Sequence, residues 1–451
     1  MKKISEALEK ARAYEKEFAV NDQTKPVFHA APPVGWLNDP NGFAVFKNQY
    51  HLFYQYHPYS TEWGPMHWGH LKSDDLISWK QLPCALAPDT AADQDGCFSG
   101  AALEYDGKHI LMYTGVANGR QAQCIAVGDG VHYEKTPENP VIDLNSADFR
   151  DPKIWRSGDS YRAVVAHRDN DGYGELLEYR SFDLRNWEQT GVIGGKDNRL
   201  GKMWECPDIF HLNGKRVILV SAQEVEGDAI RGIHPGNTSV YFIHGADGLG
   251  EARAVDYGLD FYAPHTLETP DGRRVMISWA QNWENYLTPN EFSYSGIMTV
   301  PRELSLCGDK LYQIPVRELD ACIRESDCPN RGRVFDLRID AETNDWFSVR
   351  LASDGRRYTS ISYDYLRNTL TIDRTYSGSR KDVLHSRAFN VRNRGGRISL
   401  RVLMDRHIME VFVNDGEQAF TCLLYTPLRC DGIEYIGSHY RYSAEKYDID
   451  I

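Results

Sequence analysis

The chain has 451 residues, of which 41% are hydrophobic and 25% are charged, and its formal net charge is −13. This length accommodates two domains, each with its own core. The excess of acidic side chains argues against nucleic acid or another polyanion as a partner. No run approaches the roughly 18 apolar residues that a membrane helix needs. The composition therefore indicates a soluble globular protein without a membrane partner.

Residues 1–24 are predicted to form a short N-terminal helical segment. The stretch MKKISEALEKARAYEKEFAVN is charged and amphipathic, and it lacks the apolar core of a secretory signal. The nine cysteines are scattered without a C-x-x-C pair, which is typical of reduced thiols. We therefore expect a cytoplasmic protein whose first helix packs on the body of the fold.

Residues 25–306 contain a repeat that predicts a five-bladed β-propeller. The segments SDDLISWK, GDGVHYEK and SFDLRNWE share a pattern, and their aromatic residues Trp79, Tyr133 and Trp187 are 54 residues apart. Short alternating apolar runs surround each match, as expected for β-strands. A strand-rich unit of this length fits a four-stranded propeller blade better than a helical solenoid repeat.

Five acidic residues follow the same period, and each lies at or just before the start of a short apolar strand. Their spacings are 54 to 56 residues, and they are Asp39, Asp95, Asp151, Glu205 and Asp260. The innermost strands of a propeller surround a central channel. The repeat therefore predicts that these five acids point into one shared funnel.

The pattern changes after residue 306. Residues 307–329 are predicted to be a linker with a short helix, and residues 330–451 contain alternating strand-like runs at the spacing of a β-sandwich. Asn414-Asp415-Gly416 is a hairpin turn signal. Glu410 lies in one of these runs and is expected to be a surface acid. The predicted class is all-β, a five-bladed propeller followed by a C-terminal β-sandwich.

Carboxylates in different environments are what glycoside cleavage requires. Asp39 lies in Asn-Asp-Pro-Asn-Gly, a turn-like sequence rich in amides that favours its charged form. Glu205 has apolar neighbours that favour the protonated form of a general acid. Asp151 follows Arg150 and is expected to stay ionised and to bind hydroxyl groups.

Metal and nucleotide chemistry have no support in the sequence. The pair His67 and His70 is more typical of a structural role than of a metal site, and no glycine-rich phosphate loop is present. No metal and no cofactor are predicted.

Six motifs, taken together, resemble glycoside hydrolase family 32, which comprises invertases, sucrose-6-phosphate hydrolases and fructan hydrolases. They are WLNDPNG (36–42), GCFSG (96–100), FRDP (149–152), WECPD (204–208), DYGLDFYAP (256–264) and TVPREL (299–304). The resemblance implies a retaining β-fructofuranosidase built as a propeller and a sandwich. By match to these motifs, Asp39 is the nucleophile, Glu205 the general acid and base, and Asp151 the transition-state stabiliser.

The resemblance also implies the side chains that contact the fructosyl unit. They are Asn38, Gln55, Trp63, Phe98, Ser99, Arg150, Tyr262 and one of Trp279 and Trp283, with Trp283 preferred. Trp68, Trp79 and Trp187 are interpreted as core residues. The chain departs from the family pattern at Ala101, which replaces a serine, and at His265, where glutamine is frequent.

Several alternatives stay open at this point. An inverting arabinanase or xylosidase on a similar propeller is the nearest rival, and a catalytically inactive sugar-binding protein is another. Sucrose, sucrose 6-phosphate and short fructo-oligosaccharides are all plausible small-molecule substrates. A phosphate would need a basic rim, for which Lys202 and Arg231 are candidates. An edge strand of the sandwich gives a possible route to a homo-oligomer.

Overall fold

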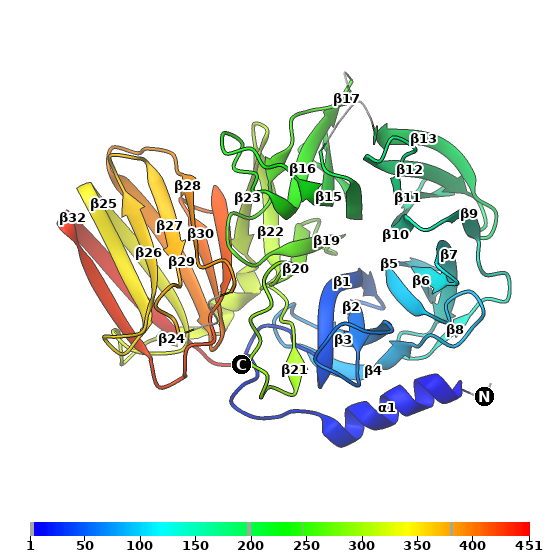
Figure 1. The fold of residues 1–451 in the computed structure, drawn as a ribbon, viewed down its shortest axis with the longest axis horizontal. Helices are drawn as coiled ribbons and strands as arrows, with labels where there is room; N and C mark the ends of the chain where they lie inside the picture. Colours follow the sequence, from blue (N-terminus) through cyan, green and yellow to red (C-terminus); the bar gives the residue numbers. More distant parts are fainter. Residues whose placement is uncertain (1–3, 196–199, 247, 379–381) are drawn as a thin grey trace.

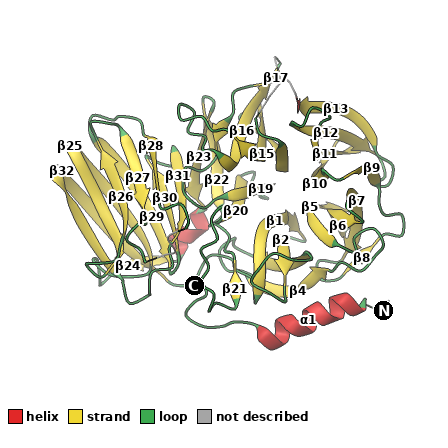
Figure 2. Ribbon diagram, in the orientation of Figure 1, coloured by secondary structure: helices red, strands yellow, loops and turns green. Residues whose placement is uncertain are grey.

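Five β-sheets surround one axis, and a nine-stranded sheet lies beside them, in the computed structural model of the protein (Figure 1). It describes residues 4–195, 200–246, 248–378 and 382–451. Figure 2 shows that strands make up nearly all of the regular structure. The prediction of an all-β protein with a five-bladed propeller and a C-terminal sandwich-like sheet is confirmed.

The first three blades follow one another along the chain. Blade I contains β1 (Gly35–Phe46), β2 (Gln49–His57), β3 (His67–Ser73), β4 (Lys80–Leu86) and the distant β21 (Tyr294–Ser295). Blade II contains β5 (Gly96–Tyr105), β6 (Lys108–Ala117), β7 (Arg120–Gly128), β8 (Tyr133–Lys135) and β9 (Ile142–Ser146). Blade III contains β10 (Phe149–Ser157), β11 (Ser160–Arg168), β12 (Gly174–Ser181) and β13 (Glu188–Gly194).

The last two blades complete the circle. Blade IV contains β14 (Met203–Leu212), β15 (Lys215–Val225), β16 (Gly236–Gly245), β17 (Gly248–Leu249) and β18 (Arg253–Ala254). Blade V contains β19 (Tyr262–Glu268), β20 (Arg274–Trp279), β22 (Arg302–Cys307) and β23 (Lys310–Pro315). The short β21 pairs in parallel with the start of β1, so a segment between two strands of blade V closes onto blade I.

The 54-residue repeat corresponds to one place in three successive blades. Trp79 directly precedes β4, Tyr133 begins β8 and Trp187 directly precedes β13. Each aromatic residue therefore marks the entry to an outer strand, where it packs against a core cluster between blades.

The propeller extends beyond the predicted boundary at residue 306. Strand β23 pairs with β22 through a tight turn at Gly308, whose φ is +64°. Leu306 and Leu311 are buried together with Leu304. Part of the predicted linker 307–329 is therefore the last strand of blade V, because its apolar side chains complete that core.

The C-terminal sheet is connected to the propeller by a short 3₁₀-helix, Arg317–Ala321. Its strands are β24 (Ile323–Glu325), β25 (Val334–Ser353), β26 (Thr359–Asp364), β27 (Thr369–Asp373), β28 (Ser386–Asn390), β29 (Arg397–Asp405), β30 (Ile408–Val413), β31 (Gln418–Leu423) and β32 (Gly432–Ile449). One core cluster of aliphatic and aromatic side chains packs within this part of the fold.

The N-terminal helix α1 (Glu6–Phe18) packs on blade I. Ser5 caps the helix by accepting a hydrogen bond from Leu8 N. Arg12 donates to Cys84 O at 2.9 Å, and Glu15 accepts from Cys84 N at 3.0 Å. These contacts hold α1 along β4 (Figure 1). Across the described residues, no helix is long and apolar enough to cross a membrane.

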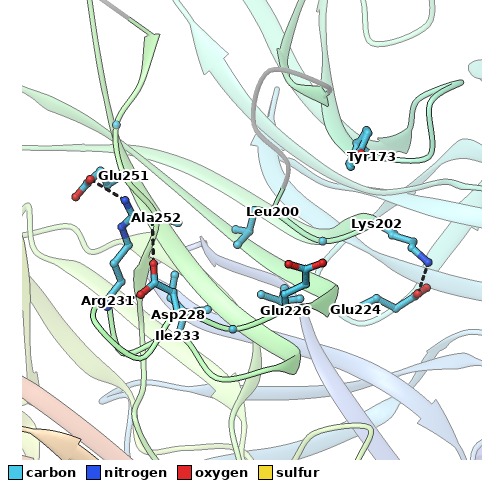
Figure 3. Close-up of a pocket in the computed structure, with 14 residues that line it drawn as sticks. Tyr173, Leu200, Lys202, Glu224, Glu226, Asp228, Arg231, Ile233, Glu251 and Ala252 are labelled. Atoms are coloured by element: carbon cyan, nitrogen blue, oxygen red, sulfur yellow. Dashed lines mark hydrogen bonds and ion pairs between the residues drawn. The ribbon is translucent and has the colours of Figure 1, made fainter.

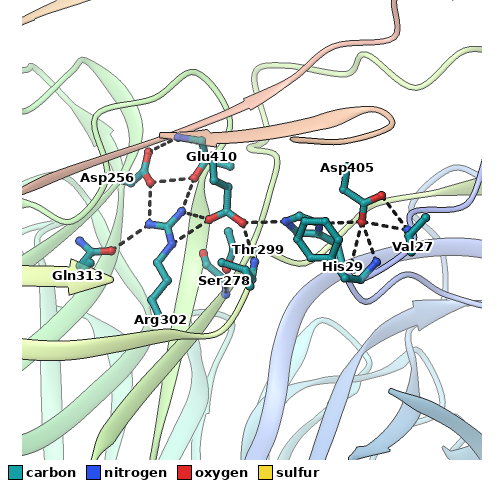
Figure 4. A network of polar contacts seen from close by, with 12 residues as sticks. Val27, His29, Asp256, Ser278, Thr299, Arg302, Gln313, Asp405 and Glu410 are labelled. Carbon is teal, nitrogen blue, oxygen red and sulfur yellow. Dashed lines mark hydrogen bonds and ion pairs between the residues drawn. The ribbon is translucent and has the colours of Figure 1, made fainter. Parts of the chain in front are cut away.

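Glu410 does not lie on the surface, so its interpretation as a surface acid is wrong. The residue is fully buried between the sandwich-like sheet and the propeller (Figure 4). Its carboxylate accepts hydrogen bonds from Arg302 Nε at 2.9 Å, from Val300 N at 2.6 Å, and contacts His29 Nε2 at 2.9 Å. The alternation of β30 turns this side chain toward the propeller, where Arg302 and His29 balance its charge.

Candidate active site

Three successive innermost strands carry the same local distortion. The register of β10, β14 and β19 shifts just after Arg150, Glu205 and Tyr262. The next residue in each strand has a positive φ, +60° at Asp151, +47° at Cys206 and +54° at Ala263. Proline follows each of them in the sequence. A β-bulge re-aims side chains out of the regular ladder, so each bulge turns a different side chain toward the funnel.

The motif WLNDPNG is part of strand β1 and does not form the predicted turn. Residues 35–46 pair with β2, and the register shifts between Leu37 and Pro40 and again between Asn41 and Ala44. Gly42 adopts a φ of +49° within the second irregularity. The turn-forming residues thus produce bulges in a long strand, because flanking residues continue to pair.

Asp39 is a buried carboxylate with 9% of its surface exposed. Ser99 Oγ donates to Asp39 Oδ2 at 2.9 Å, and the thiol of Cys206 lies 3.6 Å from the same oxygen. Its other oxygen, Oδ1, is buried and makes no hydrogen bond within the described part of the chain. Burial and the charge of Glu205 raise the pKa of Asp39 to about 6. The shift is opposite in direction to the one expected from the turn-like sequence, but a pKa of about 6 still leaves the carboxylate mostly ionised at neutral pH.

Asp151 lies next to Asp39 across the thiol of Cys206. The backbone N–H of Cys206 donates to Asp151 Oδ2 at 3.0 Å, and Cys206 Sγ is 3.6 Å from that oxygen. Burial and the charge of Glu205 outweigh the opposing charge of Arg150, and they raise the pKa of Asp151 to about 7. The expectation that Asp151 stays ionised throughout does not hold, because its sequence neighbour Arg150 binds elsewhere.

Glu205 has polar partners, in contrast to the apolar surroundings that its sequence neighbours suggest. Arg150 Nε lies 3.0 Å from Oε1. Tyr262 OH donates to Oε2 at 2.8 Å, and Gln223 Nε2 donates to the same oxygen at 2.9 Å. Met203 and Trp204 are buried in the core between blades and do not surround the carboxylate.

Two of the five acids in the predicted period do not reach the funnel. Asp95 is exposed and accepts a hydrogen bond from Asn118 N at 2.7 Å. Asp260 is fully buried but pairs with Arg374 of the sandwich-like sheet. The bulges explain the error, because Asp151, Cys206 and Ala263 are the equivalent positions in blades III, IV and V. A fixed period cannot follow such one- to three-residue shifts.

The predicted sugar-contact residues fall into two groups. Ser99, Arg150 and Tyr262 bind the carboxylates directly. The other five lie on neighbouring elements. Asn38 accepts a hydrogen bond from Trp36 Nε1 at 2.7 Å, and Gln55 donates to Cys97 O at 3.0 Å. The rings of Trp63 and Phe98 meet edge to face with centroids 6.0 Å apart, and Trp283 stacks on Trp36. Trp63 is 49% exposed, which suits a contact with a bound molecule.

Sequence reasoning missed two residues that support the carboxylates. Gln223 lies near the end of strand β15, where it pairs with Met203, and it reaches Glu205. Thr114 of β6 accepts from Asp151 N at 2.9 Å. Each lies on the second strand of its blade, outside the motifs. The only sequence feature that could have identified them is a polar residue near the end of an apolar run.

A buried polar cluster lies one step further along the same three strands. Lys153, Asp208 and His265 are the residues at which regular pairing resumes after each bulge. Lys153 Nζ contacts Asp208 Oδ2 at 2.9 Å, Thr266 O at 2.8 Å and His265 Nδ1 at 3.4 Å. This cluster ties blades III, IV and V together below the bulges. His265, a departure from the family pattern, is thus part of the support and not of the carboxylate group.

A pocket of about 630 Å³ begins beside the strand that carries Glu205 (Figure 3). It contains both candidate phosphate ligands. Lys202 pairs with Glu224 at 2.6 Å, and Arg231 pairs with Asp228 at 3.0 Å and Glu251 at 2.8 Å. Each cation is thus matched by a carboxylate (Figure 3), which weakens it as an anion ligand. In the described ranges, no group of three or more His, Cys, Asp or Glu residues could hold a metal ion.

The fold and the grouped carboxylates define a propeller glycoside hydrolase. Comparison with known families agrees: residues 29–315 match the Glycosyl hydrolases family 32 N-terminal domain, and residues 318–449 match the Glycosyl hydrolases family 32 C terminal. The chain belongs to glycoside hydrolase family 32.

Its relatives include several hydrolases. A sucrose-6-phosphate hydrolase of Escherichia coli is 36% identical and a raffinose invertase of the same organism 33% identical, with 89% of each chain covered in both cases. A β-fructofuranosidase of Bombyx mori has a similar structure, with a TM-score of 0.86, 32% identity and coverage of 98% of this chain and 97% of that chain. A variant of that enzyme has been solved in complex with sucrose.

Proposed function

We propose that the protein is a retaining β-fructofuranosidase in which Asp39 attacks the anomeric carbon of a terminal fructosyl unit. The observation that carries the proposal is the pair formed by Asp39 and Glu205. Asp39 has a buried oxygen that makes no hydrogen bond to any of the described residues, and Glu205 is close enough for its charge to raise the pKa of Asp39. A nucleophile and an acid on either side of a glycosidic bond are the requirement for double displacement.

In the first step, ionised Asp39 forms a bond to the anomeric carbon while the bond to the leaving oxygen breaks. Glu205 gives its proton to that oxygen. The group of three carboxylates faces one guanidinium, Arg150, and burial holds a proton in the group up to near neutral pH. The fructosyl group is then bound to Asp39, and the leaving group departs as an alcohol.

In the second step, a water molecule replaces the leaving group. Glu205, now a carboxylate, removes a proton from the water as its oxygen attacks the anomeric carbon, and the bond to Asp39 breaks. Tyr262 and Gln223 hold Glu205 in place for both transfers. Asp151 binds fructose hydroxyl groups, and its ionised form stabilises the positive charge that develops on the ring.

The relatives support a fructoside as the substrate. Those named above are called sucrose-6-phosphate hydrolase, raffinose invertase and β-fructofuranosidase. They favour this function over an inverting arabinanase or xylosidase, and the complete carboxylate group favours an enzyme over an inactive sugar-binding protein. Sucrose, sucrose 6-phosphate and short fructo-oligosaccharides are the substrates to compare.

Fructose release from these three substrates, measured side by side, identifies the preferred one. The pairing of Lys202 and Arg231 with carboxylates predicts that neither residue confers a preference for the phosphorylated sugar. Absence of fructose release from all three would contradict the proposed function.

The substitution Glu205→Gln tests the role of the acid. We expect it to slow sucrose hydrolysis by about 10²- to 10⁴-fold and to slow an activated aryl β-fructofuranoside much less, since a good leaving group needs no proton. Glu224→Gln makes the same chemical change at an exposed neighbouring residue and is the matched control. Equal losses on both substrates would exclude Glu205 as the acid.

A cytoplasmic location and self-association are further predictions. Six of the nine cysteine thiols are buried and reduced, as in proteins of a reducing compartment. Cell fractionation tests the location, and light scattering of the purified protein tests whether it forms a homo-oligomer.

A further inference from the structure

The segment between β20 and β21, residues 280–293, starts at the same end of the propeller as the catalytic carboxylates. Trp279, the last residue of β20, pairs with Tyr262, whose hydroxyl group binds Glu205. At its other end, the segment enters β21, which pairs with Gly35 and Trp36 at the start of β1. The segment therefore crosses from the strand beside the acid to the strand that carries Asp39.

Four aromatic side chains gather where this segment crosses. The centroid of Trp36 lies 6.2 Å from that of Trp283, with the rings stacked, 5.6 Å from that of Tyr286 and 5.8 Å from that of Trp279. Trp36 also donates to Asn38, the residue before Asp39. An uninterrupted chain of contacts thus leads from the nucleophile to Tyr286.

Tyr286 is the exposed member of this aromatic group. Trp36 and Trp279 are buried and Trp283 is half-buried, whereas Tyr286 is 39% exposed. A ring that packs on the edge of a site and leaves part of its surface open can offer an apolar surface to a ligand.

The sandwich-like sheet holds the segment on both sides of Tyr286. Asn285 donates to Leu259 O at 2.9 Å and accepts from Leu384 N at 3.0 Å. Leu287 is buried in a cluster with Ile408 and Leu423. Thr288 and Tyr425 join through their hydroxyl groups at 3.2 Å. Three sequence neighbours of Tyr286, one before it and two after it, are therefore fixed by contacts with, or next to, the C-terminal sheet.

We propose that Tyr286 forms an aromatic platform for the leaving-group sugar of the substrate, and that the sandwich-like sheet determines where this platform stands. The inference rests on the proposed function, since it assigns a place to the group that departs from the fructosyl unit. The C–H face of a pyranose ring is apolar and matches an aromatic ring. Tyr286 is thus a specificity-determining residue, and the C-terminal sheet contributes to substrate choice without supplying a catalytic residue.

The test compares two substrates that differ only in the leaving group. Sucrose has a pyranose there, and methyl β-D-fructofuranoside has a methyl group. We expect Tyr286→Ala to raise the KM for sucrose about 3- to 10-fold, in line with the loss of one aromatic contact, and to change the KM for the methyl fructoside less than 2-fold. Tyr286→Phe keeps the ring and is expected to behave as the unchanged protein.

Tyr105→Ala is the matched control, because Tyr105 is a 45% exposed tyrosine at the end of β5, away from the segment. An unchanged KM for sucrose in Tyr286→Ala, or an equal rise for both substrates, would overturn the proposal. If the unchanged protein hydrolysed neither fructoside, the proposed function itself would fail, and this outcome is distinct from a platform that has no effect.

The role of the sheet has its own variant. Tyr425→Phe removes the hydroxyl group that meets Thr288 and keeps the ring in the core. We expect a 2- to 4-fold rise of the KM for sucrose with no change for the methyl fructoside. Tyr442→Phe, an exposed tyrosine elsewhere on the same sheet, is the control. A sucrose KM in Tyr425→Phe that equals that of the control would show that the sheet does not position the platform.

Discussion

Two groups of three buried or partly buried carboxylates can be compared in this protein. Asp39, Asp151 and Glu205 lie at the bulges of the propeller funnel, where Arg150 pairs with Glu205 and its charge also acts on Asp151. The second group, Asp256, Asp405 and Glu410, lies between the propeller and the sandwich-like sheet (Figure 4), where Arg302 and His29 contact it. The two groups share residue types and differ in how their charge is balanced.

The balance of charge differs between the two groups, although burial raises the pKa of Asp256 in the interface as well. In the interface, burial would lower the pKa of His29, but hydrogen bonds and charges from Asp405 and Glu410 outweigh it and raise that pKa to about 9. Burial would likewise raise the pKa of Glu410, but Arg302 and His29 hold it below its usual value. In the funnel, burial wins, and the pKa values of Asp39 and Asp151 rise. The interface carboxylates, which pair with Arg302 and His29, join the two domains. The funnel carboxylates have fewer balancing cations and are available for proton transfer.

The largest expected effect comes from the nucleophile. We expect Asp39→Asn to reduce turnover of sucrose by about 10⁴-fold or more, because an amide cannot form the glycosyl ester. Initial rates measured on a protein with an unchanged circular dichroism spectrum check this. Ser99→Ala, which removes only a hydrogen bond to Asp39, is the comparison variant, and it should lose far less activity. Residual turnover of Asp39→Asn within tenfold of the unchanged protein would contradict the assignment.

A second prediction concerns the compensated group. We expect Glu410→Gln to lower the free energy of unfolding by about 3–5 kcal/mol, since it leaves Arg302 buried with less balancing charge. Sucrose turnover well below the melting temperature should be retained, because Glu410 does not belong to the funnel. Denaturant unfolding gives the free energy, with the exposed Glu342→Gln as control. A midpoint equal to that of the control would mean that the network does not join the domains.

A third variant probes the buried pair below the bulges. Lys153→Met removes the ammonium group that joins Asp208 to the backbone of Thr266. We expect kcat for sucrose to fall about tenfold with KM changed less than 2-fold, because the strands that carry Asp151 and Glu205 lose their link. Lys108→Met, on an exposed hairpin, is the control. A folded Lys153→Met protein with normal kcat would show that the pair serves stability alone.

The smallest expected effect is a gain of stability from the inactive variant. The pKa of Asp39 is raised from 3.8 to about 6 in the folded protein, so its ionisation destabilises the fold as the pH rises through this interval. Asp39→Asn is therefore expected to raise the melting temperature by a few degrees at pH 7.5 and to make little difference at pH 4. Thermal melts across this pH range measure the change. A larger rise of the melting temperature at pH 4 than at pH 7.5 would contradict the raised pKa of Asp39.

The sequence allowed much of the architecture to be predicted, because it depends on local and periodic features. Trp79, Tyr133 and Trp187 mark equivalent strand entries, and five of the six motifs lie where the innermost strands begin, whereas TVPREL leads into β22, the third strand of blade V. The nearby acids were harder to assign. Asp95 and Asp260 fit the period but not the funnel, since bulges shift the register by amounts that no periodicity contains.

The electrostatics of individual residues could not be predicted from sequence neighbours. Arg150 directly precedes Asp151 in the sequence, but its side chain binds Glu205. Glu205 has partners from three other strands. Glu410 has an unremarkable sequence context, and its partners His29 and Arg302 are more than 100 residues away in the chain. Such long-range contacts depend on how blades and sheet meet.

At the three bulges that precede a proline, the side chain can differ while the pairing of the strand stays the same. Asp151, Cys206 and Ala263 all have a positive φ, between +47° and +60°, although their side chains differ in charge, size and reactivity. Proline needs no hydrogen-bond partner for its nitrogen, so the ladder loses nothing at the following position. Each of these three positions can therefore carry a different side chain without a change in the pairing of its strand. Ala263, which carries the smallest of these side chains, is fully buried in a core cluster with Tyr262 and Trp279, so this bulge carries an apolar side chain where the other two carry a carboxylate and a thiol.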